Sequence, residues 1–217
     1  MNDSCVIIGG GGHAKVLIDC LTLINEVRIE GVLEKNEIQW GRKILDVPVL
    51  GGDDLIDEML IRGVRYFVVG VGGTGDNRIR QRLFEFGLHK GLEPMTIIHP
   101  AAIVSSWAML KSGCQILSGA IINPGALLER NAIVNSGAIV EHDCVIGEHA
   151  HIATGAKLGG GVRIGAYAHV GLGASIRQYI NVGEYALIGA GAVVTRDVPK
   201  SQTVTGSPAR PLQKKSA

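Results

Sequence analysis

Aromatic side chains are scarce in this chain of 217 residues, at 4% of the sequence, whereas glycine occurs 31 times. A core filled by large rings is therefore excluded, and small residues that recur at regular intervals are indicated instead. An excess of charge is also missing, because 21 basic residues nearly balance 20 acidic ones. Without a strong net field, we expect neither a nucleic-acid partner nor an anionic membrane partner.

Long hydrophobic runs are missing as well. The first apolar run, residues 5–8, is too short for the core of a signal peptide and has no basic flank, and no later run approaches membrane-spanning length. The four cysteines form neither a CxxC pair nor the spacing of a zinc site. These features predict a cytoplasmic protein without membrane insertion, whose thiols are reduced and buried.

A repeat of six residues fills the second half of the chain. From Ala101 the sequence divides into sixteen consecutive hexads, in which Val, Ile or Leu fills every fourth position and Ala or Cys fills fourteen of the second positions. Positions two and four of an extended hexad point to the same side, so they face a common interior. Glycine at many first positions permits a corner after each strand. The pattern predicts a parallel β-helix with eighteen residues in each triangular turn.

The first half of the chain instead alternates between two kinds of pattern. Buried strands are expected over residues 5–10, 28–34, 47–51 and 65–72, and helices over residues 14–24, 53–63 and 77–91. Such alternation is typical of a small parallel α/β sheet. We therefore predict an α/β half-Rossmann domain over residues 1–96, the β-helix over 97–200 and a C-terminal tail over 201–217.

A glycine-rich loop, GGGGHA at 9–14, lies between a predicted strand and a predicted helix. Free amides at the start of a helix favour a phosphate, and Glu34 lies where dinucleotide enzymes hold a ribose. The domain is too short for both halves of a dinucleotide site, so we favour a nucleotide sugar as the ligand. A simple tight turn capped by His13 is the alternative. Gly72 and Gly73 follow a later strand, at an edge of the sheet where ligands also bind.

The stretch IVEHDCVIGEHAHI at 139–152 gathers three histidines, and the hexad register separates them. Cys144 falls at an inward second position, so it is a core residue and not a nucleophile. His142 and Asp143 fall at a corner, and Gly160 lies one turn after His142. His151 and His169 fall on outward faces eighteen residues apart, where they are expected to stack. No metal site is predicted, and His149 at another corner receives no role.

The corner residues have the chemistry that acyl transfer needs. Histidine has an ordinary pKa of about 6.5, so His142 can take a proton from an amine or hydroxyl nucleophile. Asp143 can fix the tautomer of that imidazole, and an amide near Gly160 can stabilise an oxyanion. The missing side chains at 159–161 are expected to leave room for a substrate beside the imidazole.

Several motifs together resemble one family. The hexads over 97–196 and the closing VTGSPAR at 204–210 are similar to those of the hexapeptide-repeat acyltransferases, whose β-helix is left-handed. GGGGHA, IHPAA at 98–102 and VEHDCVIG at 140–147 narrow the resemblance to bacterial sugar acetyltransferases that join a short nucleotide-binding domain to this β-helix. The resemblance implies a homotrimer with active sites in the clefts between neighbouring subunits, and acetyl-CoA as the acetyl donor.

The same resemblance implies roles for single residues. His142 matches the proposed general base, and Asp143 matches its partner. His151 and the backbone at Gly160 match contacts to the acetyl group of acetyl-CoA. The residues that match its pantetheine groove are Leu172 and Ala190. The residues that match nucleotide-sugar contacts are Gly11, Gly12, His13, Glu34, Lys35 and Gly72.

These observations predict an acetyl-CoA-dependent N-acetyltransferase that acts on a nucleotide-linked amino sugar, such as a UDP- or GDP-4-amino-4,6-dideoxy sugar, in surface glycan synthesis. An imidazole base serves a hydroxyl equally well, so O-acetylation of the sialic acid type is an alternative. A β-helical zinc hydratase and a non-catalytic nucleotide sensor are further alternatives. In the tail, Arg210, Lys214 and Lys215 are candidates to meet the phosphates of CoA.

Overall fold

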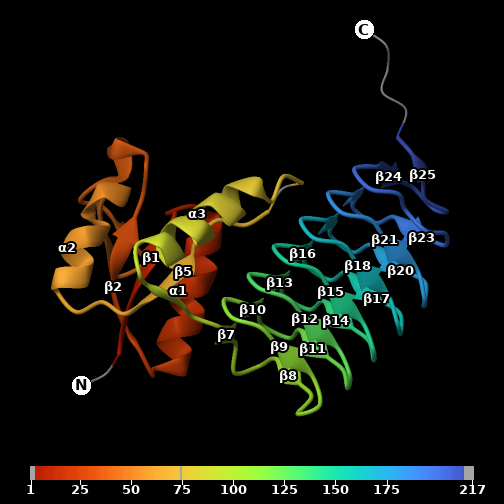
Figure 1. Cartoon of the computed structure of the whole chain (residues 1–217), viewed down its shortest axis with the longest axis horizontal. Coiled ribbons are helices and arrows are strands. Elements are labelled where there is room, and N and C mark those ends of the chain that lie inside the picture. The colour runs from red at the N-terminus through yellow and green to blue at the C-terminus, as the bar shows by residue number, and fades with distance from the viewer. Residues whose placement is uncertain (1–2, 74, 213–217) are drawn as a thin grey trace, which may run out of the picture. The chain divides into compact units, whose positions relative to one another are not determined.

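The computed structural model describes residues 3–73 and 75–212, and these residues form two compact units (Figure 1). The first unit extends to Gly72 and resumes over Arg78–Pro100. The second comprises Gly73–Asn77 and the chain from Ala101 onward. Lys214 and Lys215 lie outside the described residues, so the prediction for them stays a prediction.

The first unit is built on a six-stranded sheet with the order β3-β4-β2-β1-β5-β6. β1, β2, β4, β5 and β6 run parallel, whereas β3 pairs with β4 in the antiparallel direction. All five residues of β1 are buried, which explains why its sequence is apolar without alternation. The strands are β1 (Ser4–Ile8), β2 (Arg28–Leu33), β3 (Lys43–Ile44), β4 (Val47–Gly51), β5 (Tyr66–Val69) and β6 (Glu93–Pro94).

The helices of this unit follow the predicted segments closely. The helix expected over 53–63 divides into a short 3-10 turn and α2, and Gly63 then takes a φ of +83° that ends it. Asn25 ends α1 in the same left-handed region, with a φ of 53°. The helical segments are α1 (Gly12–Ile24), η1 (Glu37–Gln39), η2 (Asp53–Leu55), α2 (Ile56–Ile61) and α3 (Arg78–His89). Among the residues described, no helix has both the length and the apolar character needed to cross a membrane.

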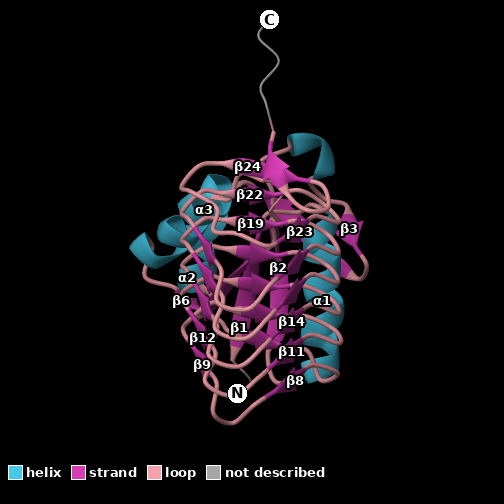
Figure 2. Cartoon of the chain, turned by 90° about the vertical axis from the view of Figure 1, so that its right-hand side faces the viewer, coloured by secondary structure: helices cyan, strands magenta, loops and turns pink. Residues whose placement is uncertain are grey.

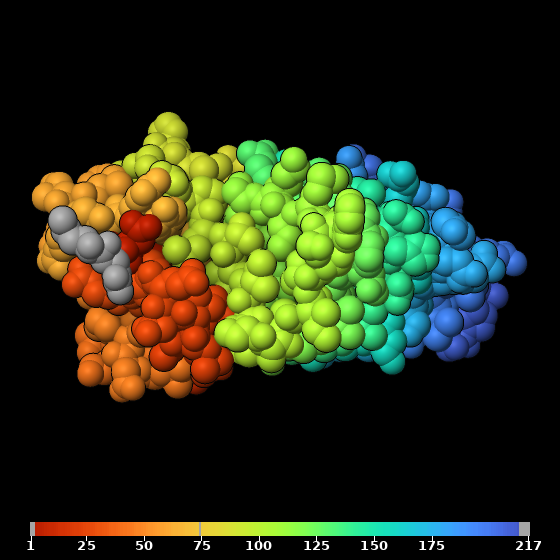
Figure 3. Space-filling model, turned by 90° about the horizontal axis from the view of Figure 1, so that it is seen from below, coloured from red at the N-terminus to blue at the C-terminus, as the bar shows by residue number. Residues whose placement is uncertain are grey.

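The second unit is the predicted parallel β-helix, and β7 (Ile97–Ile98) precedes it in the chain. From β8 to β23, strands pair in parallel with the strand eighteen residues further on, as Ile121 does with Ile139, so the hexad register holds there without a slip. At the end of the unit, β22 instead pairs with β24, Leu187 opposite Thr203, and β25 pairs with β24 in the antiparallel direction. The coils follow one another in chain order from green to blue (Figures 1 and 3) and appear edge-on in Figure 2.

Three sheets form the walls of the β-helix, and each is named here after its first strand within the second unit. The β8 sheet contains β8 (Ile103–Val104), β11 (Ile121–Ile122), β14 (Ile139–Val140), β17 (Lys157–Leu158), β20 (Ser175–Ile176) and β23 (Val193–Val194). The β9 sheet contains β9 (Met109–Leu110), β12 (Leu127–Leu128), β15 (Val145–Ile146), β18 (Arg163–Ile164) and β21 (Asn181–Val182). The β10 sheet contains β10 (Gln115–Ile116), β13 (Ile133–Val134), β16 (His151–Ile152), β19 (His169–Val170), β22 (Leu187–Ile188), β24 (Thr203–Thr205) and β25 (Arg210–Pro211).

The core of the β-helix consists of the second and fourth hexad positions, as predicted. Ala138 and Val140 of one hexad are both fully buried, and the pattern repeats along the helix. Glycine at the first position takes a positive φ at many corners, for example +65° at Gly137. At six corners a larger residue takes the same positive φ, which the sequence analysis did not expect. These residues are Asn131, Asp143, His149, Tyr167, Tyr179 and Tyr185.

Candidate active site

His142 and Asp143 form a polar pair at the corner between β14 and β15. Nδ1 of His142 donates a hydrogen bond to Oδ2 of Asp143 over 2.9 Å. Asp143 takes a φ of 58°, so a left-handed corner residue supplies the carboxylate. The two side chains are 54% and 73% exposed, which keeps the pair open to a ligand. Because Nδ1 carries the proton in this bond, Nε2 of the neutral ring has a lone pair that can accept one.

Gly160 lies one coil above His142, and the imidazole leans over it. A Cβ added to Gly160 would collide with Nε2 of His142. The imidazole can therefore take its present position only because residue 160 is glycine. The expectation that the missing side chain leaves room for a substrate there is therefore wrong, because the imidazole itself fills that room. The described residues form no backbone hydrogen bond from the N–H of Gly160, whereas the N–H of Gly161 donates to His142 O over 2.8 Å.

Tyr179 is a further residue at this corner, and the sequence analysis did not select it. Its ring covers Gly161, because a Cβ there would lie 2.5 Å from Cδ1 of Tyr179. The tyrosine is 72% exposed, and its N–H donates to Gly160 O over 2.9 Å. The signal was present in the register, since position 179 lies two turns after Asp143. The corner therefore presents an imidazole, a carboxylate and an aromatic face.

Cys144 belongs to the core, as predicted. The residue is fully buried, and its Sγ donates a hydrogen bond to Gly159 O over 3.2 Å. Burial raises the pKa of its thiol to about 11. A thiolate is therefore disfavoured near neutral pH, and the residue is not a nucleophile.

His151 and His169 pair across β16 and β19, as the register predicted, with ring centroids 5.0 Å apart and the rings edge-on. Their expected exposure is wrong, because the two residues are only 4% and 8% exposed. Nδ1 of His151 lies 3.0 Å from Gly73 O, in the segment Gly73–Asn77 that belongs to this unit. That segment covers the ring, so direct contact of His151 with an acetyl group stays a prediction.

His149 is also buried, at 1% exposure, although a corner was expected to turn its side chain outward. Its Nδ1 lies 2.9 Å from Nδ2 of Asn131, one coil below. Above it, the ring stacks on Tyr167 with centroids 5.1 Å apart, and Tyr167 stacks on Tyr185 at 4.6 Å. This column of side chains gives His149 a structural role.

Leu172 and Ala190, predicted to line the pantetheine groove, lie at a different corner from His142. Both are exposed and follow strands of the β10 sheet, where the chain turns into the β8 sheet. His142 lies at the corner between the β8 and β9 sheets. One chain therefore does not bring the predicted base and the predicted groove together, and only a second chain can do so.

The glycine-rich loop lies at the carboxyl end of β1, as predicted. Gly11 is the N-cap of α1 and has no side-chain cap, so the amides at the start of the helix are not used by a capping side chain. Gly11 and Gly12 are exposed, and a Cβ at either would meet nothing within 4 Å. Across the loop, a Cβ on Gly72 would lie 3.5 Å from Cβ of His13.

Glu34 holds the loop in the structure, and its predicted contact with a ligand stays a prediction. Its two carboxylate oxygens accept hydrogen bonds from Gly10 N over 2.6 Å and from Asn36 N over 2.9 Å. Glu34 therefore braces the loop itself. Lys35 beside it is exposed. The sequence analysis did not select Asp53, which lies near Glu34. Burial raises the pKa of the Asp53 carboxyl group, and the carboxylate of Glu34 raises it further.

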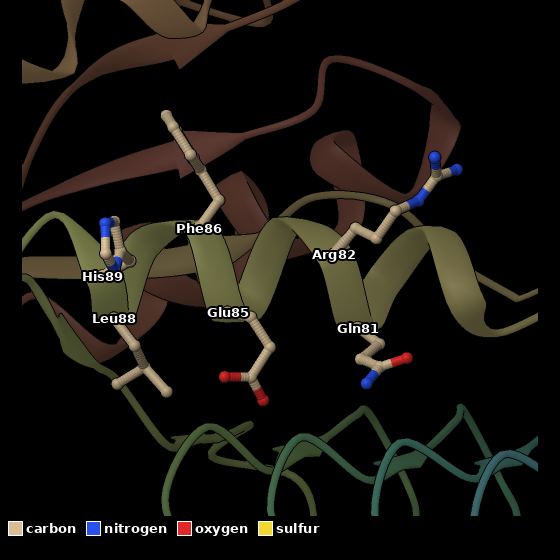
Figure 4. Close-up of a pocket in the computed structure, with 6 residues that line it drawn as sticks. All are labelled: Gln81, Arg82, Glu85, Phe86, Leu88 and His89. Atoms are coloured by element: carbon tan, nitrogen blue, oxygen red, sulfur yellow. The ribbon is translucent and has the colours of Figure 1, made fainter.

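A hollow of about 720 Å³ runs along α3 and is lined by residues of that helix alone (Figure 4). Gln81 and Glu85 point to one side of the helix and Phe86 to the other. None of the predicted site residues lines this hollow, so we do not place the reaction there. Within residues 3–73 and 75–212, no group of three or more His, Cys, Asp or Glu side chains is arranged to hold a metal ion.

Comparison with known proteins identifies relatives of both units. Residues 4–86 match the PglD N-terminal domain family. The UDP-N-acetylbacillosamine N-acetyltransferase of Bacillus subtilis is 35% identical over 115 residues, a match that covers 52% of this chain and 50% of that enzyme. The chain thus matches half the length of this curated relative.

Solved structures match the chain over almost its whole length. The GDP-perosamine N-acetyl transferase of Caulobacter crescentus, in complex with CoA and GDP-perosamine and with one histidine replaced by alanine, is 34% identical with a TM-score of 0.93, and the match covers 99% of both chains. The acetyltransferase domain of PglB from Neisseria gonorrhoeae FA1090, in complex with acetyl coenzyme A, is 34% identical with a TM-score of 0.88, and the match covers 98% of this chain and all of that domain.

Proposed function

Because the chain belongs to the family of hexapeptide-repeat nucleotide-amino-sugar acetyltransferases, we propose that it transfers the acetyl group of acetyl-CoA to the amine of a nucleotide-linked amino sugar. Membership of the family confirms the predicted enzyme class and the left-handed β-helix preceded by an α/β unit. The single observation that carries the reaction is the His142–Asp143 pair, whose free Nε2 lies over Gly160. A cytoplasmic location and a role in surface glycan synthesis stay predictions.

His142 acts as the general base in this proposal. Asp143 holds Nδ1–H, so Nε2 accepts the proton of the attacking amine while the N–C bond forms and the C–S bond of the thioester breaks. The N–H of Gly160 is free of the β-helix ladder and supplies a donor for the developing oxyanion. CoA leaves as the thiol once it takes up a proton, and no covalent intermediate on the protein is required.

The nucleotide portion of the substrate is assigned to the glycine-rich loop. The amides at the start of α1 and the positive end of its dipole favour a diphosphate, and exposed Gly11 and Gly12 let the backbone approach it. The relatives support a nucleotide sugar, because the Caulobacter enzyme is seen with GDP-perosamine and the Bacillus enzyme is a UDP-N-acetylbacillosamine N-acetyltransferase. The choice between guanine and uracil is left to the assay.

A homotrimer is also part of the proposal, and two outward stripes of apolar residues support it. Position three is apolar in the first three coils of the β8 sheet and of the β9 sheet, whereas Lys157 and Arg163 follow in the fourth. Ile103 and Met109 are 65% and 58% exposed in the single chain. A closed ring of three subunits needs two different contact surfaces on each chain, one for each neighbour. The two stripes provide these surfaces. The residues of the stripes are Ile103, Ile121, Ile139, Met109, Leu127 and Val145.

Association of this kind would also let the corner of His142 meet the corner of Leu172 and Ala190 from a second chain. Light scattering on the purified protein tests it. A mass three times that of the 22.9 kDa chain supports the proposal, and a monomer contradicts it.

Replacement of His142 by alanine tests the catalytic assignment. We expect His142→Ala to lower kcat by roughly a hundredfold or more, the scale of a lost general base. Thiol release from acetyl-CoA is measured with UDP- and GDP-linked amino sugars and with matched hydroxy sugars. His89→Ala, an exposed histidine on α3, is the control and should turn over normally. Near-normal turnover of His142→Ala contradicts the assignment, and turnover of hydroxy sugars alone would favour O-acetylation.

A further inference from the structure

The three corners of the β-helix are filled in different ways. At the corner between the β10 and β8 sheets, glycine takes a positive φ in successive coils from Gly119 to Gly191. At the corner between the β9 and β10 sheets, side chains stack on one another from Asn131 to Tyr185. The corner of His142 differs from both, because residues with a side chain alternate with glycine there. This alternating column consists of Trp107, Gly125, Asp143, Gly161 and Tyr179.

The carboxylate of Asp143 lies against Gly125, one coil below it. A Cβ added to Gly125 would collide with Oδ1 of Asp143, whereas Cγ of Asp143 would stay 3.5 Å from that Cβ. Tyr179 lies over Gly161 in the same way. The carboxylate of the catalytic pair therefore occupies the space that a side chain at position 125 would take.

The backbone holds Gly125 beneath Asp143. The N–H of Asp143 donates to Pro124 O over 3.1 Å, and the N–H of Gly125 donates to Trp107 O over 3.2 Å. Pro124 O and the N–H of Gly125 belong to the same planar peptide unit. This unit is therefore bonded to the coil above and to the coil below, so it cannot readily move away from the carboxylate.

Both oxygens of the Asp143 carboxylate are placed by this corner. Oδ2 accepts the hydrogen bond from Nδ1 of His142 over 2.9 Å, and Oδ1 is the atom that lies over Gly125. Because a carboxylate is planar, a group that displaces Oδ1 also turns Oδ2 out of line with Nδ1–H. On the opposite side of the pair, Nε2 of His142 lies against Gly160 of the coil above. One glycine below and one above thus enclose the pair.

We propose that Gly125 is a positioning residue for the reaction, because the space above it lets the Asp143 carboxylate lie where it fixes the proton on Nδ1 of His142. This inference rests on the proposed function and extends it to a residue that acts only through Asp143. Gly125 lies eighteen residues before Asp143, outside the stretch that holds the histidines. A side chain at position 125 turns the carboxylate aside and leaves the tautomer of His142 less firmly fixed.

Gly125→Ala tests the proposal against Gly119→Ala, a matched change in the same coil. Both glycines have a positive φ, +75° and +67°, so alanine brings similar backbone strain at either position. A Cβ at Gly119 would approach Gly137 N only to 3.8 Å, an ordinary contact. Because six corners already carry larger residues at a positive φ, both variants should fold, with similar losses in Tm. Only Gly125→Ala should lower kcat, by roughly fivefold.

A double variant separates positioning from strain. If Gly125 acts through the carboxylate, its replacement has no further effect once Asp143 is alanine, so kcat of Gly125→Ala/Asp143→Ala should equal that of Asp143→Ala. The inference is overturned if Gly125→Ala turns over as fast as Gly119→Ala, or if the double variant loses about another fivefold in kcat. The proposed function fails separately, if the unmodified protein releases no thiol from acetyl-CoA with any amino sugar.

Discussion

His142 and His151 lie nine residues apart in the same repeat and yet have opposite surroundings. His142 is exposed at a corner, with one ring nitrogen bound to Asp143 and the other free over Gly160. His151 is 4% exposed, with both nitrogens engaged by Asn135 and Gly73. The repeat position sets the direction of a side chain. The segment that covers a face sets whether that side chain can meet a ligand.

The comparison separates an open histidine from a covered one. An open imidazole with a free lone pair suits proton transfer, which needs access to the nucleophile. A buried imidazole with both nitrogens satisfied is held in one position, since its hydrogen bonds lie in a poorly solvated environment. The following predictions test each side of this contrast.

Gly160→Ala should have the largest effect on turnover, because it displaces the ring of His142 without replacing the histidine. The added Cβ would collide with Nε2, so the ring must turn away from its present position. We expect kcat to fall by about a hundredfold, comparable with loss of the base itself. Ala166 occupies the same hexad position one hexad later, so the backbone at this position accepts alanine. Turnover close to that of the control Ser118→Ala would show that this position of the ring is not required.

Asp143→Ala should have an intermediate effect. Without the carboxylate, nothing in the corner fixes the proton on Nδ1, and a larger fraction of the rings presents the wrong tautomer. We expect kcat to fall by roughly tenfold, with KM for the sugar nearly unchanged. Asp143→Asn is the matched variant, because asparagine accepts a left-handed backbone and keeps an acceptor oxygen. Its kcat should lie between that of the unmodified protein and that of Asp143→Ala. A loss in Asp143→Ala with normal turnover in Asp143→Asn would indicate a backbone effect instead.

Much of the fold was predictable because the β-helix is specified locally. Each hexad carries its own inward pair and its own corner, so the register from Ala101 to Arg196 determines the sheets and the core. The role of Cys144 followed from the same register. Even so, the pattern did not show that Asp143 or Tyr179 would take the left-handed corner conformation usually given to glycine.

The candidate site was predictable only where it depends on neighbours one coil apart. The pairing of His142 with Asp143 is local, and the approach of Gly160 follows from the repeat. The burial of His151 depends on Gly73, which is 78 residues away, and no periodic pattern connects them. Glu34 was assigned to a ligand because its position matches a known motif, and its hydrogen bonds to Gly10 N and Asn36 N were not expected.

The buried side of the comparison also predicts a smaller effect on stability. Burial lowers the pKa of His169 below its ordinary value of 6.5, and its Nδ1 is buried without a hydrogen-bond partner among the described residues. The unfolded chain therefore binds this proton more readily than the folded chain as the pH falls through 6.5. The stability contributed by the neutral imidazole is complete above that pH and is lost progressively below it.

Replacement of His169 by a side chain that does not titrate should remove this part of the acid sensitivity. We expect the Tm of His169→Gln to change less steeply than that of the unmodified protein between about pH 7 and pH 5, the range in which histidine ordinarily titrates. His89→Gln changes an exposed histidine and should leave the slope as it is. Thermal unfolding followed by circular dichroism at several pH values gives both slopes. Parallel curves for His169→Gln and the unmodified protein would mean that burial on the β10 sheet does not hold this imidazole neutral.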